Sequence, residues 1–412
     1  MNKFFGTDGI RGIANRYPIT PEMCVKIAIS TGISLINKSS KKHRVIIAKD
    51  TRLSGYLIET ALTSGFISIG MDVMLLGPIP TPAVSMLVKS MKADLGIMIS
   101  ASHNSYEYNG IKIFGSDGNK LSVYEEEEIE KRIINNNLSI ESTEIGKCYR
   151  IDGAGERYIE FAKSTVSKDV NFENLKVVID SANGASYKIA STVLWELGCD
   201  VISIHDSPNG SNINEKCGAT YPKAIQEKVM LSLANVGIAL DGDSDRVIMC
   251  DEFGNIINGD KIIAIIATFM KRQNKISNNT VVVTDISDSN MEKYLQSIGL
   301  QVIRTKVGDK YVVEKMLQLR SNIGGEQSGH IILGNYNNTG DGLVAALQVL
   351  YIMLKTNKTL HELSNCYAPS LQFTNNIRYY NFRKDRSCEI VISRIQDTSQ
   401  EIRNRTIDKN IN

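Results

Sequence analysis

Residues 95–103 read Leu-Gly-Ile-Met-Ile-Ser-Ala-Ser-His, an apolar run of strand type that ends directly in small polar residues. Two further strand-type runs precede it, at Arg44–Ala48 and Asp72–Leu76. Helical patterns lie between the runs, at about Leu57–Ile69 and from Thr81-Pro82 onward. Strands that alternate with amphipathic helices are typical of α/β domains. The serine loop is therefore expected at the carboxyl end of a strand, where open α/β sheets bind ligands.

The alternation recurs twice further along the chain, each time as a β-branched run, a helix and a second run. Three units of similar build predict three consecutive α/β domains. Polar segments near residues 148–155, 252–255 and 364–369 are the expected boundaries, and the composition changes after Pro369. The repeated elements are Lys176–Asp180, Tyr187–Leu197 and Asp200–Ile204, then Val281–Thr284, Met291–Ile298 and Leu300–Arg304.

The composition excludes several classes of protein. A net charge of +2 over 412 residues, without a long basic run, argues against nucleic-acid binding. No apolar run approaches the roughly 20 residues of a membrane-spanning helix, and the first residues do not resemble a signal peptide. The 7 cysteines are scattered, which favours reduced thiols in the cytoplasm over a disulfide framework or a zinc site.

An acidic loop, Asp241-Gly242-Asp243-Ser244-Asp245, lies between two strand-type runs. Carboxylates at alternate positions of an extended chain point to one side, where a hard cation such as Mg²⁺ can neutralise them. One alternative is a calcium loop of the EF-hand type, since Glu252 occupies its terminal position. Arg246 stands where that loop needs glycine, however. A solvated acidic turn without metal is the other alternative.

Ser102 is the candidate nucleophile of the serine loop. A serine becomes reactive only beside a base or an electrophilic partner. His103 is adjacent, and Lys112 follows in Tyr108–Lys112. A serine that caps a strand end is an equally good interpretation of this segment taken alone.

Two glycine-rich segments complete the set. In Phe5–Gly12, three glycines surround Arg11 and would let a phosphate approach a fixed cation. In Gly324–His330, glutamate, serine and histidine between glycines suit hydrogen bonds to sugar hydroxyls. The alternatives are a glycine-rich turn with a salt-bridged arginine, and a hairpin loop with a structural histidine.

In this order along the chain, the four motifs resemble those of the α-D-phosphohexomutase superfamily, from about Phe4 to about Pro369. Gln327 is similar to the residue that the glucosamine branch has at this position, whereas the phosphomannomutase branch tends to have Met there. The matching segments are Gly6–Gly12, Ala101–Asn104, Asp241–Arg246 and Gly325–His330, with Asn212–Asn214 and Cys217-Gly218 also similar to the glucosamine branch.

The resemblance implies a role for each site residue. Ser102 would carry a phosphoryl group, pass it to the sugar phosphate and recover the other phosphoryl from a sugar bisphosphate, which serves as intermediate and primer. One Mg²⁺ would be held by Ser102, Asp241, Asp243 and Asp245. Lys112 would be the general acid/base, assisted by Arg11 and His330. The implied substrate-binding residues are Arg246, Gly308, Lys310, Glu326 and Ser328. Ser105 and Lys310 depart from the family pattern, which usually has Pro and Arg there.

The fold that the resemblance implies has three similar α/β mixed-sheet domains and a fourth α+β domain, with the active site in the central cleft. We expect the domains at residues 1–152, 153–252, 253–366 and 367–412. The family's fourth domain carries a phosphate-binding loop of the form R-P-S-G-T-E-P, and no such run follows Pro369. We therefore expect an incomplete fourth domain, with an under-paired strand at Leu371–Tyr380 and a disordered or loosely packed Phe382–Asn412.

The implied activity is the interconversion of glucosamine 6-phosphate and glucosamine 1-phosphate, which feeds UDP-N-acetylglucosamine and peptidoglycan precursors. The expected partner is a hexosamine phosphate rather than nucleic acid or a membrane, and a homodimer is compatible with the sequence. The alternatives are a phosphoglucomutase/phosphomannomutase and a truncated mutase of weak or no activity that still binds Mg²⁺ and sugar phosphate.

Overall fold

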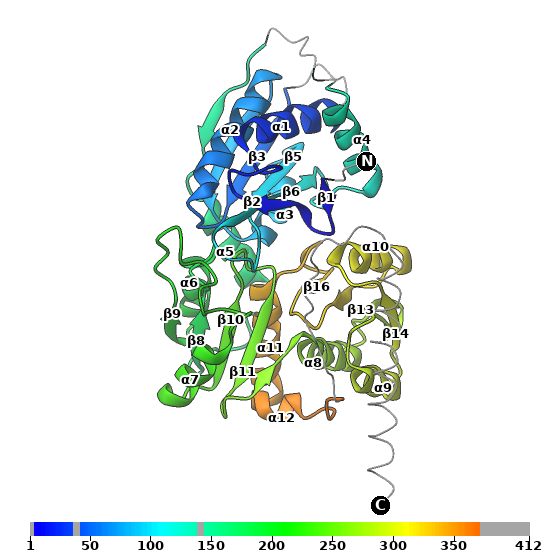
Figure 1. The fold of residues 1–412 in the computed structure, drawn as a ribbon. Coiled ribbons are helices and arrows are strands. Elements are labelled where there is room, and N and C mark those ends of the chain that lie inside the picture. Colours follow the sequence, from blue (N-terminus) through cyan, green and yellow to red (C-terminus); the bar gives the residue numbers. More distant parts are fainter. Residues whose placement is uncertain (1–3, 36–41, 137, 139–143, 371–412) are drawn as a thin grey trace, which may run out of the picture. The chain divides into compact units, whose positions relative to one another are not determined.

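Three β-sheets follow one another along the chain in the computed structural model, which describes residues 4–35, 42–136, 138 and 144–370 (Figure 1). Within these residues the first sheet has seven strands in the order β1-β2-β6-β5-β3-β4-β7. The second has five, β12-β11-β10-β8-β9, and the third has four, β14-β13-β15-β16. Each sheet mixes parallel and antiparallel pairs, so the predicted mixed-sheet α/β class is confirmed.

The first sheet is covered on both faces. In its central strand β3, Val45 and Ile47 pack into one apolar cluster with α1, α2 and α4, whereas Ile46 and Ala48 pack into another with α3. Successive side chains of a strand point to opposite faces, so a strand covered twice needs an unbroken apolar run. The elements are β1 Phe5–Gly6, β2 Gly9–Ile13, α1 Pro21–Leu35, β3 Arg44–Lys49, α2 Ser54–Ser68, β4 Asp72–Pro78, α3 Thr81–Ser90, β5 Leu95–Ile99, β6 Tyr108–Gly115, α4 Val123–Ile134 and β7 Cys148–Arg150.

The second and third sheets share one apolar cluster with the α3 face of the first. Helices α8 and α11 contribute much of it, and both are buried along most of their length. The second region comprises α5 Ala154–Ser164, β8 Lys176–Asp180, α6 Ile189–Glu196, β9 Asp200–Ile204, α7 Lys223–Ser232, β10 Val236–Leu240, β11 Val247–Asp251 and β12 Ile256–Ile257. The third comprises α8 Gly259–Arg272, η1 Ser277–Asn279, β13 Thr280–Thr284, α9 Ser289–Ser297, β14 Gln301–Thr305, α10 Asp309–Leu319, β15 Ile323–Gly325, β16 Ile331–Leu333, α11 Gly342–Thr356 and α12 Leu360–Ser364.

The predicted helices and strands of the three repeats are all present, with ends shifted by a few residues. Helix α4 begins at Val123, because Ser122 and Glu125 form a reciprocal capping box. Strands β1, β2 and β6 were not predicted, and the glycines of β1 and β2 had suggested a turn. The expectations for Leu371–Tyr380 and Phe382–Asn412 lie outside the described residues, and the domain limits stay predictions. No helix among the described residues is long and apolar enough to cross a bilayer.

Candidate functional site

Ser102 lies in the loop between β5 and β6, with its side chain buried. Its φ of +51° is unusual for a residue with a side chain. The hydroxyl donates a 2.6 Å hydrogen bond to Asp241 Oδ2, and His103 Nδ1 lies 3.4 Å from the same hydroxyl oxygen. Burial, together with Arg246 and Arg11, lowers the pKa of His103 to about 4. The imidazole beside Ser102 is therefore neutral at pH 7.

The acidic loop Asp241–Arg246 is the turn between the antiparallel strands β10 and β11, where Leu240 pairs with Val247. Strands on both sides rule out the EF-hand alternative, which needs helices there. The side chains of Asp241, Asp243 and Asp245 are buried, so the solvated-turn alternative is also wrong. One carboxylate oxygen of each lies within 4.8 Å of the other two.

The electrostatics of this loop favour a bound cation. Burial, with Asp245 and Asp243 nearby, raises the pKa of Asp241 to about 8. The Oδ1 atoms of Asp243 and Asp245 are buried and accept no hydrogen bond from the described residues. Buried carboxylate oxygens without donors are costly unless a cation neutralises them. The three residues therefore fit a hard, oxygen-seeking divalent cation such as Mg²⁺.

Lys112 lies on β6 opposite Met98 of β5. Its Nζ donates to Asp243 Oδ2 at 2.7 Å and to Asp245 Oδ2 at 2.8 Å, and it lies 3.1 Å from Asp8 Oδ2. Burial alone would lower the pKa of this ammonium, but the three carboxylates hold it well above the usual value. Lys112 is thus a buried proton donor within hydrogen-bonding distance of the acidic loop.

Two arginines face the same region. Arg11, on β2, forms an ion pair with Asp8, which agrees with the salt-bridged-turn interpretation of this segment. Arg246 Nε lies 3.9 Å from Asp245 Oδ1. The Nε atoms of both arginines are nevertheless buried and donate no hydrogen bond to the described residues. Buried guanidinium donors without an acceptor suit the oxygens of a phosphoryl group.

The predicted sugar loop is the turn of the β15–β16 hairpin, so the hairpin interpretation of this segment is correct as well. Glu326 Oε1 accepts a 3.0 Å hydrogen bond from the amide of Gly308, and Oε2 accepts one of 3.3 Å from Ser328 Oγ. The hairpin also contacts the acidic loop, because Arg246 and His330 form an isolated antiparallel bridge.

His330 is buried between the acidic loop and α10. Its Nε2 accepts a 3.2 Å hydrogen bond from the amide of Gly340, so Nδ1 carries the proton, 3.7 Å from Asp245 Oδ1. Burial opposes the charged form, but Asp245 and Asp309 raise the pKa of His330. The imidazole therefore supports the acidic loop through Asp245.

Lys310 differs from the other predicted site residues. It lies in the first turn of α10, and its Nζ forms a 2.5 Å ion pair with Glu126 of α4. The Lys310 side chain therefore points toward Glu126. Gly308, two positions earlier in the chain, instead contacts Glu326 of the sugar loop. The contacts described above join the other predicted site residues to the acidic loop, the serine loop or the sugar loop, except Arg11, which pairs with Asp8.

Several residues of the site were not predicted from the sequence. Asp8 pairs with Arg11, Lys112 and Lys120, and although burial opposes ionisation, these cations hold its pKa well below the usual value. Lys120 also pairs with Asp309. Asp8 lies between Gly6 and Gly9 in the segment predicted to bind phosphate, and this position could have marked it as a site residue. Nothing in the sequence singled out Lys120.

Arg52 is the other unpredicted residue, and it is fully buried behind the serine loop. Its Nη2 donates to the carbonyl oxygens of Ser102 and Asn104, both at 2.9 Å, and its Nη1 donates to that of Tyr108 at 3.1 Å. Asp50 accepts from Arg52 Nε at 2.8 Å and holds the guanidinium in place. Arg52 therefore fixes the backbone on both sides of Ser102.

Comparison with known proteins decides the family. Models of the phosphoglucomutase/phosphomannomutase α/β/α domains I, II and III match residues 2–139, 156–254 and 258–369. A phosphoglucosamine mutase of Rhizobium johnstonii is 51% identical over 379 residues, which cover 91% of this chain and 84% of that protein. The chain belongs to the α-D-phosphohexomutase superfamily. Phosphohexomutases are isomerases, and this chain is a phosphohexomutase of the phosphoglucosamine mutase group.

Solved phosphohexomutases share the fold at low sequence identity. A phosphomannomutase-like protein from Thermus thermophilus superposes with a TM-score of 0.78 at 24% identity, covering 88% of this chain and 82% of that one. The N-acetylphosphoglucosamine mutase of Aspergillus fumigatus, solved with GlcNAc-6P and magnesium, gives a TM-score of 0.55 at 16% identity, covering 89% and 80%. The acidic triad of this mutase lies in the second of the three matched domains.

Proposed function

We propose that this phosphohexomutase interconverts glucosamine 6-phosphate and glucosamine 1-phosphate, with Ser102 as the phosphoryl carrier. The observation that carries the proposal is the convergence of unsatisfied groups of both signs around Ser102. Two buried carboxylate oxygens lack a donor and two buried guanidinium Nε atoms lack an acceptor among the described residues. A phosphoryl group together with a divalent cation would satisfy all four.

The proposed metal site consists of the Ser102 oxygen, Asp241, Asp243 and Asp245. Bound Mg²⁺ would neutralise charge on the transferring phosphoryl group. Arg11 and Arg246 would bind phosphoryl oxygens through their unsatisfied Nε donors. These arginines would hold the phosphoryl group in a fixed orientation. Phosphoryl transfer depends mainly on such positioning and on charge neutralisation.

Lys112 is the proposed general acid/base. When the phosphorus–oxygen bond to Ser102 breaks and a bond to a sugar oxygen forms, the serine oxygen needs a proton and the sugar hydroxyl loses one. The protonated Lys112, held against Asp243 and Asp245, can donate its proton to Ser102 Oγ, and the neutral amine can then take up the proton that the sugar hydroxyl releases. His330 assists by keeping Asp245 in place.

The sugar is the proposed ligand of the Glu326 loop. Glu326, Ser328 and the amide of Gly308 already form one hydrogen-bonded group, which a sugar hydroxyl could join. Lys310 would bind substrate only after leaving Glu126. A sugar bisphosphate is the proposed intermediate and primer, because the sugar must present each of its two phosphoryl positions to Ser102 in turn.

The 51% identity to a phosphoglucosamine mutase supports the amino sugar as substrate, and Gln327 points the same way. The product, glucosamine 1-phosphate, would be used in the synthesis of UDP-N-acetylglucosamine. The cytoplasmic location and a homodimer stay predictions from the sequence.

Coupled assays on separate sugars test the substrate. We expect turnover of glucosamine 6-phosphate to exceed that of glucose and mannose phosphates at equal Mg²⁺ concentration. Faster turnover of mannose or glucose phosphate would instead support the phosphoglucomutase/phosphomannomutase alternative.

A further inference from the structure

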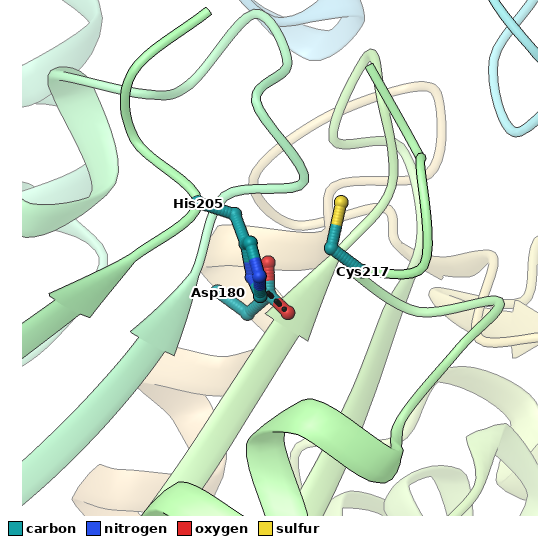
Figure 2. A group of neighbouring side chains, drawn as sticks. All are labelled: Asp180, His205 and Cys217. Carbon is teal, nitrogen blue, oxygen red and sulfur yellow. Dashed lines mark ion pairs between the residues drawn. The ribbon is translucent and has the colours of Figure 1, made fainter. Parts of the chain in front are cut away.

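Three side chains of different chemistry meet in the second sheet, away from the acidic loop (Figure 2). Asp180 is the last residue of β8, and His205 directly follows the neighbouring parallel strand β9. Cys217 comes from the loop that leads to α7. One carboxylate oxygen, one imidazole nitrogen and the thiol sulfur lie within 4.8 Å of one another. The proposed reaction uses none of these groups.

The carboxylate of Asp180 is held in a fixed orientation. Its Oδ1 accepts a 2.9 Å hydrogen bond from the amide of Ala182, and its Oδ2 accepts one of 2.9 Å from the amide of Gly218. Each carboxylate oxygen keeps a second lone pair. Backbone donors that orient a carboxylate in this way are the usual outer shell of a metal ligand.

The imidazole of His205 forms an ion pair with this carboxylate. Nδ1 lies 3.1 Å from Asp180 Oδ2, and Asp180 raises the pKa of His205. A metal ion bound here would take the place of the imidazole proton. The φ of His205 is +48°, in the left-handed region that most side chains avoid. A side-chain exposure of 32% leaves the imidazole accessible from solvent.

Cys217 supplies the soft ligand. Its side chain is buried, and burial raises the pKa of the thiol to about 12. One carboxylate, one thiolate and one neutral imidazole carry two negative charges, which a divalent cation cancels in a buried site. Nitrogen, sulfur and carboxylate ligands on one ion are typical of zinc, whereas Mg²⁺ prefers oxygen alone.

We propose that Asp180, His205 and Cys217 form a second metal site, which binds Zn²⁺ or a similar thiophilic cation and is separate from the Mg²⁺ loop. The S–H bond of Cys217 breaks, a sulfur–metal bond forms, and the proton goes to solvent. Three protein ligands leave a fourth position for water. The scattered cysteines of the sequence gave no sign of this site, because the fold assembles it from three separate segments.

The loop that supplies Cys217 also contacts the serine loop. Asn214, three residues before Cys217, donates from its side chain to the carbonyl oxygen of Ser102 at 2.9 Å and from its amide to that of Ala182 at 2.9 Å. Occupancy by zinc would therefore fix the segment that holds the proposed phosphoryl carrier. Metal binding itself does not depend on the proposed function.

The test is a titration of the purified chain with Cd²⁺ and then Zn²⁺, in excess Mg²⁺ to occupy the acidic loop. We expect one equivalent of Cd²⁺ to produce a sulfur-to-cadmium charge-transfer absorption, and Zn²⁺ to remove it. Calorimetry in buffers of different ionisation enthalpy should show proton release on binding. Cys217→Ser should abolish the absorption, and His205→Asn should weaken binding at least about tenfold.

Cys199→Ser is the matched control, because Cys199 is a buried thiol of the same region whose pKa is also raised to about 12 by burial. Its titration should equal that of the wild type. His205 is partly exposed, so His205→Asn keeps the test valid if Cys217→Ser does not fold. A cadmium signal of equal size and affinity in wild type and His205→Asn would overturn the proposal. Absence of the signal in wild type would do so too, leaving a plain Asp180–His205 ion pair.

Discussion

Arg52 Nη2 donates a 2.9 Å hydrogen bond to the carbonyl oxygen of Ser102, although the two residues are 50 positions apart in the sequence. The same guanidinium reaches the carbonyls of Asn104 and Tyr108, and Asn214 reaches those of Ser102 and Asn104 from the second region. The proposed phosphoryl carrier is thus positioned by groups that never touch its hydroxyl. The left-handed φ of Ser102 is maintained by this set of contacts.

Arg52→Lys tests this positioning. A lysine ammonium cannot reproduce the planar fork that serves Asp50 and the four carbonyls of Ser102, Asn104, Ser105 and Tyr108 at once. Loss of charged hydrogen bonds at about 1.5–3 kcal/mol each predicts a fall in kcat of roughly tenfold to a hundredfold. The KM for the sugar phosphate should stay nearly constant, because Arg52 does not face the substrate. Arg157→Lys, at an exposed position of α5, is the control and should match the wild type. Equal kcat in Arg52→Lys and wild type would contradict the positioning role.

Asp243→Asn tests the metal loop. The substitution removes one negative charge and replaces one carboxylate oxygen with an NH2 group, which cannot ligate a cation. The Mg²⁺ concentration for half-maximal turnover should rise by more than about tenfold. Loss of a residue that only hydrogen-bonds to a metal ligand already weakens metal binding about tenfold, and Asp243 is a proposed ligand itself. A chelator should abolish wild-type turnover and Mg²⁺ should restore it. Asp152→Asn, at an exposed position, should leave the Mg²⁺ dependence unchanged. Turnover that persists fully in chelator would exclude the metal.

Gly242→Ala tests the close approach of the acidic and serine loops. A Cβ at position 242 would lie 2.6 Å from the carbonyl oxygen of Ser102, which is backbone and cannot move aside cheaply. We expect a loss of stability of about 1–3 kcal/mol, measured as a lower denaturant midpoint. Gly155→Ala is the contrasting control, because its Cβ meets only Ile189 at 3.6 Å and helix α5 gains propensity. A Gly242→Ala protein as stable as Gly155→Ala would refute the predicted clash.

Asp341 should make stability depend on pH. Burial raises its pKa to about 6 in the folded protein, although Val344, Tyr158 and Asn337 donate hydrogen bonds to it. Because the folded pKa lies above the usual value of 3.8, the stabilising contribution is complete below about pH 4 and is lost as pH rises through about 6. The difference between the two pKa values corresponds to roughly 3 kcal/mol.

Urea midpoints between pH 4 and 7 measure this effect. Asp341→Asn removes the titrating group but keeps an acceptor for the amide of Val344, so its midpoint should fall less steeply with pH than that of the wild type. Parallel pH curves for the two proteins would show that Asp341 does not titrate in this range.

The helices, most strands and the acidic loop could be predicted from the sequence, because they depend on the local pattern of residues. Periodicity located the strands β3, β4, β5, β8 and β13. Alternate aspartates indicated a metal loop, and the buried triad agrees with it. Strand β6 was missed because Tyr108–Gly110 has the composition of a turn, and only its pairing with both β5 and β2 makes it a strand.

The supporting residues could not be predicted, since their roles depend on long-range contacts. Arg52 follows a strand in an ordinary polar segment, and nothing local indicates that its guanidinium is buried. Lys120 and Asp309 come together only when the first and third regions pack. Lys310 was expected at the substrate, but its ion pair with Glu126 depends on the position of α4.

The central claim is that Ser102 carries the phosphoryl group that the sugar exchanges. Intact-mass and peptide analysis of the purified protein tests it directly, before and after addition of excess glucosamine 6-phosphate, with Ser102→Ala alongside. The account predicts one phosphoryl group on the Ser102 peptide of the wild type, its transfer to the sugar on mixing, and neither adduct nor turnover in Ser102→Ala. A Ser102→Ala protein that turns over glucosamine 6-phosphate at the wild-type rate, or a phosphoryl group on a different residue that the sugar removes, would contradict it.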